Sequence, residues 1–288
     1  MLLGTILLWA LNITITKYVI EHGFQPLAYA TTRYFAATSL FWCFTYARER
    51  SFKIRLSDGK LVAIAAALVF VNQLCFVYSV DKSSASTVAL ILGTTPIFIG
   101  IVATLAGVEK NLSAKFWAAA AISFVGVGFI ASGTGGFSGN ITGDGLALLT
   151  AATWGGYSVT IAPLIRRYSA FRVSALVLAL GWVPLAIVGT PQLLDQSFHF
   201  STRSWIGFGY AVVGPLFLTN ILWFTAIDRV GPARASLFAN MQPFFAVLFA
   251  IIILGDSLNR WEIVGALAIA GGILLERSHR LPTEPPGD

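Results

Sequence analysis

Charged side chains are scarce in this 288-residue sequence. Only 11% of the residues are Asp, Glu, Lys or Arg, whereas 56% are hydrophobic and the mean hydropathy is +0.77. A water-soluble domain carries about 25% charged residues. This deficit excludes an ordinary soluble enzyme and indicates that most of the outer surface faces membrane lipid.

Cysteine is almost absent as well, since Cys43 and Cys75 stand alone in apolar runs. Two isolated thiols form neither a disulfide framework nor a metal site, so we expect no metal and treat both as small hydrophobic residues. The net charge of +6 comes from short basic clusters between apolar runs rather than from one continuous stripe. This pattern argues against nucleic acid as a partner.

Motifs of the common enzyme classes are missing or incomplete. The sequence has no GxxxxGK[ST] phosphate loop and no HExxH zinc motif, so we expect neither ATP hydrolysis nor metalloprotease chemistry. The stretch from Gly136 to Gly139 matches a GxSG pattern, but the three histidines fall in expected loops or in the tail, which leaves a serine nucleophile without a base. A GxGD aspartyl-protease motif that ends in Gly143 and Asp144 would need glycine at position 141, which is Ile141. We therefore expect no enzyme and no cofactor, with an intramembrane hydrolase as the least favoured alternative.

Apolar runs long enough to cross a bilayer recur along the chain, because about 20 residues span a hydrocarbon core of roughly 30 Å. Seven runs carry no charged side chain, and they lie between Lys60 and Asp81, Lys82 and Glu109, Lys115 and Asp144, Asp144 and Arg166, Arg172 and Asp195, Arg203 and Asp228, and Arg234 and Asp256. Three further runs contain one or two charges: Leu2 to Ile20, Pro26 to Ala47 and Ser257 to Leu275. The sequence thus predicts an all-α integral membrane protein with ten transmembrane helices.

Basic residues gather in alternate connections between the predicted helices. The connection that follows the second helix holds five of them between Arg48 and Lys60, and the connections after the fourth, sixth, eighth and tenth helices are also basic. Short cytoplasmic loops hold this excess, so both termini are expected in the cytoplasm. The first run has no basic residue ahead of it, which favours a retained helix over a signal peptide and suggests natural residues upstream of Met1.

The second half of the chain weakly repeats the first. Residues Leu8 to Asn12 align with Thr153 to Tyr157, and Val77 to Phe98 aligns without a gap with Phe224 to Phe245. Each copy contains five predicted helices, an odd number, so the second copy must enter the membrane inverted. Matching connections carry opposite charge bias, as this inversion requires.

We therefore expect a first five-helix repeat over residues 1–140 and a second, inverted repeat over residues 141–280, around a central cavity. The polar, proline-rich tail over residues 281–288 is expected to be disordered. Inverted repeats with a substrate site near the bilayer midplane are typical of secondary transporters.

Ten apolar runs in two inverted sets of five resemble the EamA-type proteins of the drug/metabolite transporter superfamily. In each set the first run contains Trp and the fourth, rich in small residues, has a central proline. The resemblance covers Leu2 to Glu276 and is strongest to bacterial exporters of aromatic amino acids. It implies a secondary transporter in the bacterial inner membrane that exports aromatic or other neutral amino acids, or related metabolites, by alternating access. A channel-like facilitator is the alternative, and the small residues of the fifth and tenth runs leave a monomer or a homodimer open.

Pro96 and Pro243 stand near the middle of the fourth and ninth runs. A proline there leaves the carbonyl of Leu92 or Ala239 without its helical partner. We expect paired bends that serve as hinges or gates beside the substrate pathway. The alternative is a tolerated kink whose free carbonyl is bound by a neighbouring Ser or Thr.

Polar and aromatic side chains within the runs predict the lining of a substrate cavity, because each is costly in lipid unless paired or hydrated. The predicted residues are Trp9, Asn12, Asn72, Gln73, Tyr78, Thr95, Trp154, Tyr157, Asn220, Trp223, Asn240 and Gln242. Amides suit the carboxylate and ammonium of an amino acid, and rings suit its apolar part. The alternatives are interhelical hydrogen bonds and, for Trp9, Trp154 and Tyr78, a place in the aromatic belt.

Arg33 is the only basic side chain well inside a predicted helix. It either binds a substrate carboxylate or has a structural role, by snorkelling or pairing. No Asp or Glu lies in the middle of a run. This absence favours downhill efflux or uniport over proton coupling through a carboxylate.

Overall fold

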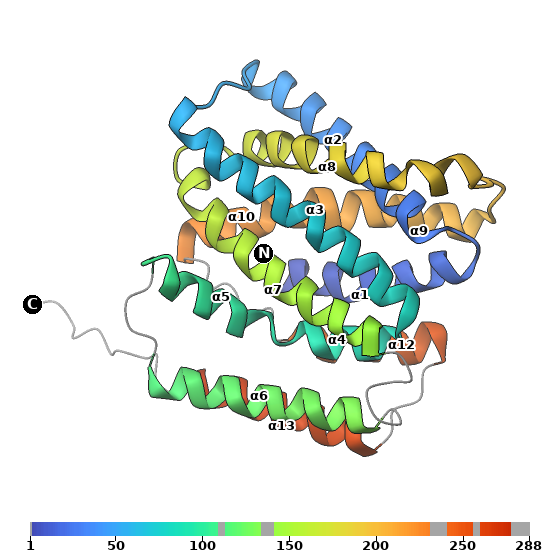
Figure 1. Ribbon diagram of the computed structural model, residues 1–288, viewed down its shortest axis with the longest axis vertical. Helices are drawn as coiled ribbons and strands as arrows, with labels where there is room; N and C mark the ends of the chain where they lie inside the picture. Colours follow the sequence, from blue (N-terminus) through green and yellow to red (C-terminus); the bar gives the residue numbers. More distant parts are fainter. Residues whose placement is uncertain (1, 109–112, 134–140, 231–240, 256–259, 278–288) are drawn as a thin grey trace, which may run out of the picture.

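The computed structural model describes residues 2–108, 113–133, 141–230, 241–255 and 260–277, and the regular elements within these ranges are helices (Figure 1). Their bounds are α1 Leu2–Glu21, α2 Pro26–Glu49, η1 Leu56–Asp58, α3 Gly59–Lys82, α4 Ala85–Leu92, α5 Thr95–Leu105, α6 Ala114–Gly133, α7 Ile141–Ile165, α8 Ala170–Asp195, α9 Thr202–Val212, η2 Val213–Leu218, α10 Thr219–Val230, α12 Gln242–Leu254 and α13 Arg260–Arg277. The short element η1 is a 3-10 helix, and η2 is a π-helical segment that joins α9 to α10. The all-helical prediction is confirmed over these ranges.

Six helical segments of the described chain are long and apolar enough to cross a membrane. They are Leu2–Glu21, Leu56–Lys82, Ala85–Leu105, Ile141–Ile165, Ala170–Asp195 and Thr202–Arg229. The sequence predicts ten. The predicted runs outside these six are those of α2, α6, α12 and α13; α2, at 24 residues, is long enough but more polar, and residues that flank the short helix α12 lie outside the described ranges.

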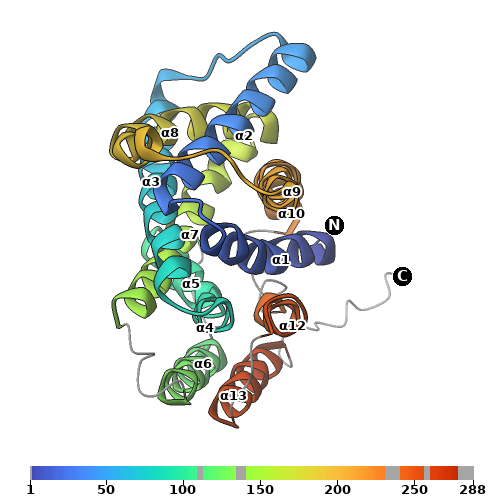
Figure 2. The same cartoon turned by 90° about the vertical axis from the view of Figure 1, so that its right-hand side faces the viewer.

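The helices form two rows, which are seen side by side in Figure 2. One row contains α3, α7, α4 with α5, and α6, whereas the other contains α9 with α10, α1, α12 and α13. The rows meet where α4 packs on α12 and where α6 packs along α13. Above them α2 packs on α8, which in turn contacts α3. The tight pairing of α6 with α13 gives their small residues a partner within the same chain.

Serine side chains cap the N-termini of three of these helices. Ser84, Ser169 and Ser201 accept hydrogen bonds from the backbone amides of Thr87, Arg172 and Ser204, at 3.0 to 3.2 Å. Each serine thereby satisfies an amide that has no carbonyl partner in the first turn. Pro26 plays a related part at the start of α2, where a missing amide hydrogen costs nothing.

The outer surface of the bundle carries many large apolar side chains. Exposed examples from five helices are Phe35, Ile187, Ile206, Ile252 and Leu267. Soluble monomers rarely expose apolar surface on this scale. The exposure therefore fits a protein whose outer face contacts lipid.

The helix that was expected to bend at Pro96 is instead interrupted. α4 ends at Leu92 and α5 begins at Thr95, so Pro96 lies in the first turn of a new helix. The Leu92 carbonyl accepts the hydroxyl hydrogen of Thr95 at 2.6 Å, and the Ile91 carbonyl accepts that of Thr94 at 2.7 Å. Neighbouring threonines therefore bind the carbonyls at this interruption, and the role of Pro96 as a hinge stays a prediction.

Pro243 occupies the equivalent position in α12, within its first turn. The Ala239 carbonyl lies outside the described residues, and so does the predicted site residue Asn240. Both prolines thus start a helix in the second part of an apolar run, a place where proline is favoured rather than disruptive.

Candidate transport site

A cavity lies at the centre of the helices and offers about 110 Å³ of room to water-sized molecules. Its lining consists of Trp9, Asn12, Ile13, Arg33, Tyr34, Val69, Asn72, Gln73, Phe76, Leu92, Thr95, Thr150, Trp154, Tyr157, Leu178, Pro215, Leu216, Asn220 and Gln242. These residues come from both rows and from the α2–α8 pair, and most lie near the middle of their helices. One chain therefore supplies the lining of the cavity.

Most of the residues predicted to bind substrate line this cavity. They are Trp9, Asn12, Asn72, Gln73, Thr95, Trp154, Tyr157, Asn220 and Gln242. Two others lie apart: the Tyr78 hydroxyl accepts a hydrogen bond from Gln192 at 3.3 Å, and Trp223 is buried behind Trp9. Arg33, whose role the sequence left open, also lines the cavity.

Arg33 is 1% exposed and makes its hydrogen bonds to neutral oxygens. Its Nη2 donates to Gln73 Oε1 at 2.6 Å, and its Nη1 donates to Asn12 Oδ1 at 3.4 Å and to the Tyr29 hydroxyl at 3.5 Å. The guanidinium carbon also lies 4.8 Å from the centre of the Tyr29 ring. Arg33 is thus buried and held by neighbours, not snorkelling to a surface.

A chain of amides holds the Arg33 contact in one orientation. Gln73 gives its oxygen to Arg33 and donates from Nε2 to Asn72 Oδ1 at 3.0 Å. Asn72 then donates from Nδ2 to the Thr150 carbonyl at 2.9 Å and to the Thr153 hydroxyl at 3.2 Å. Because each amide has one end fixed by the next, the Gln73 oxygen must face the guanidinium.

Two polar atoms in the cavity lining have no protein partner, although both are buried. These are Arg33 Nε and the Tyr157 hydroxyl, and Tyr157 is also 1% exposed. Buried polar groups are almost always hydrogen-bonded, to protein, water or ligand. The residues that line the cavity therefore carry hydrogen-bonding capacity that the described protein atoms do not use.

Aromatic rings form one wall of the cavity. The ring centroids of Trp9 and Trp154 lie 5.3 Å apart in an edge-on arrangement, and Trp154 lies 5.2 Å from Tyr157. Trp223 supports Trp9 from behind at 5.0 Å. Trp9 and Trp154 are the tryptophans aligned in the sequence repeat, and both line the cavity in contact with each other.

The π-helical segment η2 adds backbone carbonyls that the sequence analysis missed. Pro215 and Leu216 line the cavity, and the Pro215 carbonyl accepts a hydrogen bond from Trp9 Nε1 at 3.3 Å. Asn220 donates to the Leu216 carbonyl. Pro215 stands in the middle of an apolar run just as Pro96 does, so the same signal pointed to it.

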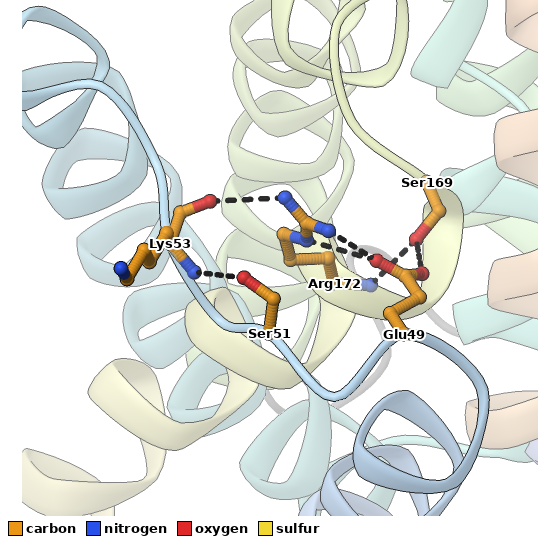
Figure 3. A network of polar contacts seen from close by, with 5 residues as sticks. All are labelled: Glu49, Ser51, Lys53, Ser169 and Arg172. Carbon is orange, nitrogen blue, oxygen red and sulfur yellow. Dashed lines mark hydrogen bonds and ion pairs between the residues drawn. The ribbon is translucent and has the colours of Figure 1, made fainter.

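At one end of the bundle, charged side chains tie the connection after α2 to the start of α8. Figure 3 shows Glu49 between Ser169 and Arg172. Arg172 donates from Nε to Glu49 Oε2 at 2.9 Å and from Nη1 to the Lys53 carbonyl at 3.0 Å. The Ser169 hydroxyl donates to the other Glu49 oxygen.

A second pair lies at the same connection. Asp58, 2% exposed, accepts from Arg167 Nη1 at 2.5 Å and from the Tyr168 hydroxyl at 2.7 Å. That hydroxyl in turn accepts from the backbone amide of Arg55 at 2.9 Å. Arg167 and Arg172 therefore each have a carboxylate partner, whereas Arg33 has none among the described residues.

The opposite end is held by amides and rings. Gln196 Oε1 accepts from the Gln25 amide and Gln192 Oε1 from the Leu27 amide, both at 2.7 Å. Phe24 stacks on Phe200 with ring centroids 4.3 Å apart. The two ends of the bundle thus use different chemistry to join the first half of the chain to the second.

Comparison with known proteins places the chain among transporters. The model of the EamA-like transporter family matches residues 1–132 and 141–276, which is nearly the whole chain. The family therefore supplies the functional class that the cavity alone does not.

Curated relatives carry the same description. The "Uncharacterized transporter YdfC" of Bacillus subtilis (strain 168) is 24% identical over 66% of this chain, and the match spans only 61% of that relative's length. An "Uncharacterized transporter" of Archaeoglobus fulgidus is 21% identical over 94% of both chains. The "Uncharacterized inner membrane transporter YedA" of Escherichia coli (strain K12) is 25% identical over 94% of this chain and 89% of its own.

A solved crystal structure is similar in fold. It superposes with a TM-score of 0.71 over 97% of each chain at 15% sequence identity. At this identity the likeness shows the shared fold alone.

Proposed function

Because this chain belongs to the EamA-like transporter family, we propose that it is a secondary transporter that exports amino acids or related small metabolites through the central cavity by alternating access. The membrane-transporter class rests on the family and its relatives. The substrate and the mechanism are our proposal. The single observation that supports them most is a central cavity lined by amides, one arginine and aromatic rings.

The helix packing supports two inverted repeats as the basis of alternating access. In the proposed repeat, α1 of the first half corresponds to α7 of the second half, and α3 corresponds to α9 together with α10. The contact between α3 and α7 should therefore have a counterpart between α10 and α1, and both contacts are present. The pairs α2 with α8 and α6 with α13 map onto themselves. Inverted repeats around a midplane site are the usual architecture for rocking one half against the other.

The lining supports an amino acid as cargo. Arg33 and the amides of Asn12 and Gln242 offer donors for a carboxylate. The carbonyls of Pro215 and Leu216 and the faces of Trp9 and Trp154 offer acceptors and π-surface for an ammonium group. An apolar side chain of the solute then rests on the aromatic wall.

Location and orientation follow from the same proposal. The E. coli relative is named as an inner membrane transporter, and we place this chain in the bacterial inner membrane with both termini in the cytoplasm. The basic connections, including the one that contains Arg167 and Arg172, then face the cytoplasm. Because one chain supplies the lining of the cavity, we take the monomer as the transporting unit, whether or not it dimerises.

Counterflow separates a carrier from a channel. Purified protein in liposomes that contain unlabelled phenylalanine should accumulate external labelled phenylalanine transiently, because a carrier exchanges one solute for another. Rates should saturate with concentration and should not need a pH gradient, since no acid lines the described cavity. Linear flux without counterflow would indicate a channel, and strict dependence on a pH gradient would contradict uncoupled transport.

Pro96 and Pro243, each in the first turn of a helix, are the proposed hinges. Replacing Pro96 with alanine lets α4 and α5 continue as one straight helix, and Pro243→Ala restores the amide hydrogen that the first turn of α12 lacks. We expect exchange to slow about tenfold while solute binding stays near wild type, because hinges govern the rate of the conformational step. Normal turnover in the double variant would contradict the hinge assignment.

A further inference from the structure

Arg33 differs from the other arginines whose contacts are described, because its buried cation faces a cavity and its contacts are neutral. The side chain is 1% exposed, and its hydrogen bonds go to two amide oxygens and one phenol. A buried cation is stable only when an opposite charge or a full set of hydrogen bonds compensates for lost hydration. Neutral contacts compensate for part of that loss.

No carboxylate of the described residues lines the cavity. The buried or partly buried acids lie at helix ends and already have partners: Asp58 binds Arg167, Glu49 binds Arg172 and Asp144 accepts from the Ser83 hydroxyl. Glu21 forms an ion pair with Lys17 near the end of α1. The lining that the structure describes therefore carries one positive charge and no negative charge.

The guanidinium also keeps donor capacity that its neighbours do not use. Its Nε has no partner, and its Nη1 contacts are long, at 3.4 and 3.5 Å. The Tyr157 hydroxyl in the same lining is also unpartnered. Guanidinium presents two parallel donors that match the two oxygens of a carboxylate.

From these observations we propose that the carboxylate of the transported solute is the counterion of Arg33, so that the cavity selects small carboxylates and rejects solutes with a net positive charge. This inference rests on the proposed function. Gln73 is a positioning residue, because its oxygen holds Nη2 at 2.6 Å and its orientation is fixed through Asn72. Tyr157 donates its hydroxyl to the same anion.

Three probes with one ring and different charge test the inference. Phenylpropionate is an anion, phenylalanine a zwitterion and phenethylamine a cation. Purified protein in chloride-free buffer is titrated with each, and binding is followed by tryptophan fluorescence, because Trp9 and Trp154 line the cavity. We expect phenylpropionate and phenylalanine to bind and phenethylamine to bind at least about tenfold more weakly. Equal binding of all three probes would overturn the inference.

Variants of Arg33 assign the selectivity to this side chain. Arg33→Gln should weaken phenylpropionate about tenfold or more and abolish the preference over phenethylamine. Arg33→Lys keeps the charge but loses the two parallel donors of the guanidinium, so it should retain the preference for phenylpropionate over phenethylamine with weaker binding. Arg166→Gln, which removes an exposed positive charge outside the cavity, is the matched control and should leave binding unchanged. Selectivity that survives in Arg33→Gln overturns the assignment, and the wild-type probe series stands as a test even where this variant fails to fold.

Three further outcomes separate this inference from neighbouring claims. If chloride alone displaces phenylpropionate with equal affinity, the counterion is an inorganic anion and the carboxylate assignment fails. If the probes bind with the expected selectivity but none crosses a liposome membrane, the transport proposal fails and the site remains. If phenylalanine is exchanged but the three probes bind equally, the carboxylate assignment fails and the transport proposal remains.

Discussion

Arg167 and Arg172 each bind a carboxylate at one end of the bundle, whereas Arg33, far more buried, meets only neutral groups. The side chains of Arg167 and Arg172 are 49% and 21% exposed, and their closest carboxylate oxygens lie 2.5 and 2.7 Å away. Arg33 is 1% exposed and has Gln73 Oε1 at 2.6 Å instead. Arg33 has lost the most hydration of the three arginines, yet it is the one without a carboxylate partner among the described residues.

This difference suggests two uses of the same side chain. At the helix ends, an internal partner makes the contact permanent and joins segments far apart in the sequence. In the cavity, an internal acid would occupy the guanidinium and repel an incoming carboxylate. Omitting it leaves the cation available to a solute, at the cost of a less stable empty state.

The largest effect should follow from giving Arg33 the acid that the end arginines have. Gln73→Glu places a carboxylate where Gln73 Oε1 now lies, 2.6 Å from Arg33 Nη2. The new internal pair should compete with the solute carboxylate and lower phenylalanine exchange about 100-fold, equivalent to about 2.7 kcal/mol. Exchange in liposomes measures the effect.

Gln25→Glu, outside the cavity, is the matched control for this substitution and should exchange phenylalanine at the wild-type rate. The thermal stability of Gln73→Glu should equal or exceed that of wild type, because the pair compensates a buried cation. Exchange within twofold of wild type in Gln73→Glu would remove the basis of the comparison.

The sequence was sufficient to predict much of the cavity. Polar residues in apolar runs must be paired or hydrated, and this rule found Asn12, Asn72, Gln73 and Asn220. The rule did not distinguish residues that line the cavity from residues buried behind them. Trp223 has the same composition signal, yet it lies behind Trp9, because helix rotation is set by packing.

Other features depended on the tertiary structure. The break before Pro96 needed the hydroxyl of Thr95, whose hydrogen bond to Leu92 replaces the missing helical one. The ion pair of Asp58 with Arg167 joins residues 109 positions apart, and local pattern carries no sign of it. Likewise, Arg33 was recognised in the sequence, but only its neighbours show that it lacks an acid.

An intermediate effect is expected from Asp58→Asn, and it should appear in stability rather than in exchange. The variant removes the charge that accepts from Arg167 and Tyr168 while keeping the side-chain shape. Arg167 is half-exposed and remains hydrated, so we expect a loss of about 1 to 2 kcal/mol. Thermal unfolding in detergent measures it, and phenylalanine exchange should stay within about threefold of wild type. A stable variant that has lost exchange would give this pair the role assigned to Arg33.

The smallest effect is expected from Glu49→Gln. Glu49 and Arg172 are each about one-fifth exposed, at 19% and 21%, so water already weakens their attraction. Glutamine keeps one oxygen that can accept from Arg172. The stability should fall by about 0.5 to 1 kcal/mol, as measured by thermal unfolding. A loss larger than that of Asp58→Asn would contradict the ranking by burial.

The thermal shift that phenylpropionate produces in Arg33→Gln and Asp58→Asn, measured beside wild type, tests the role of Arg33 most directly. A ligand that binds the folded state raises the unfolding temperature by mass action. Asp58→Asn should unfold earlier than wild type yet gain the full shift, whereas Arg33→Gln should unfold no earlier than wild type and gain almost none. An equal shift in Arg33→Gln and wild type would contradict a solute carboxylate as the missing partner of Arg33.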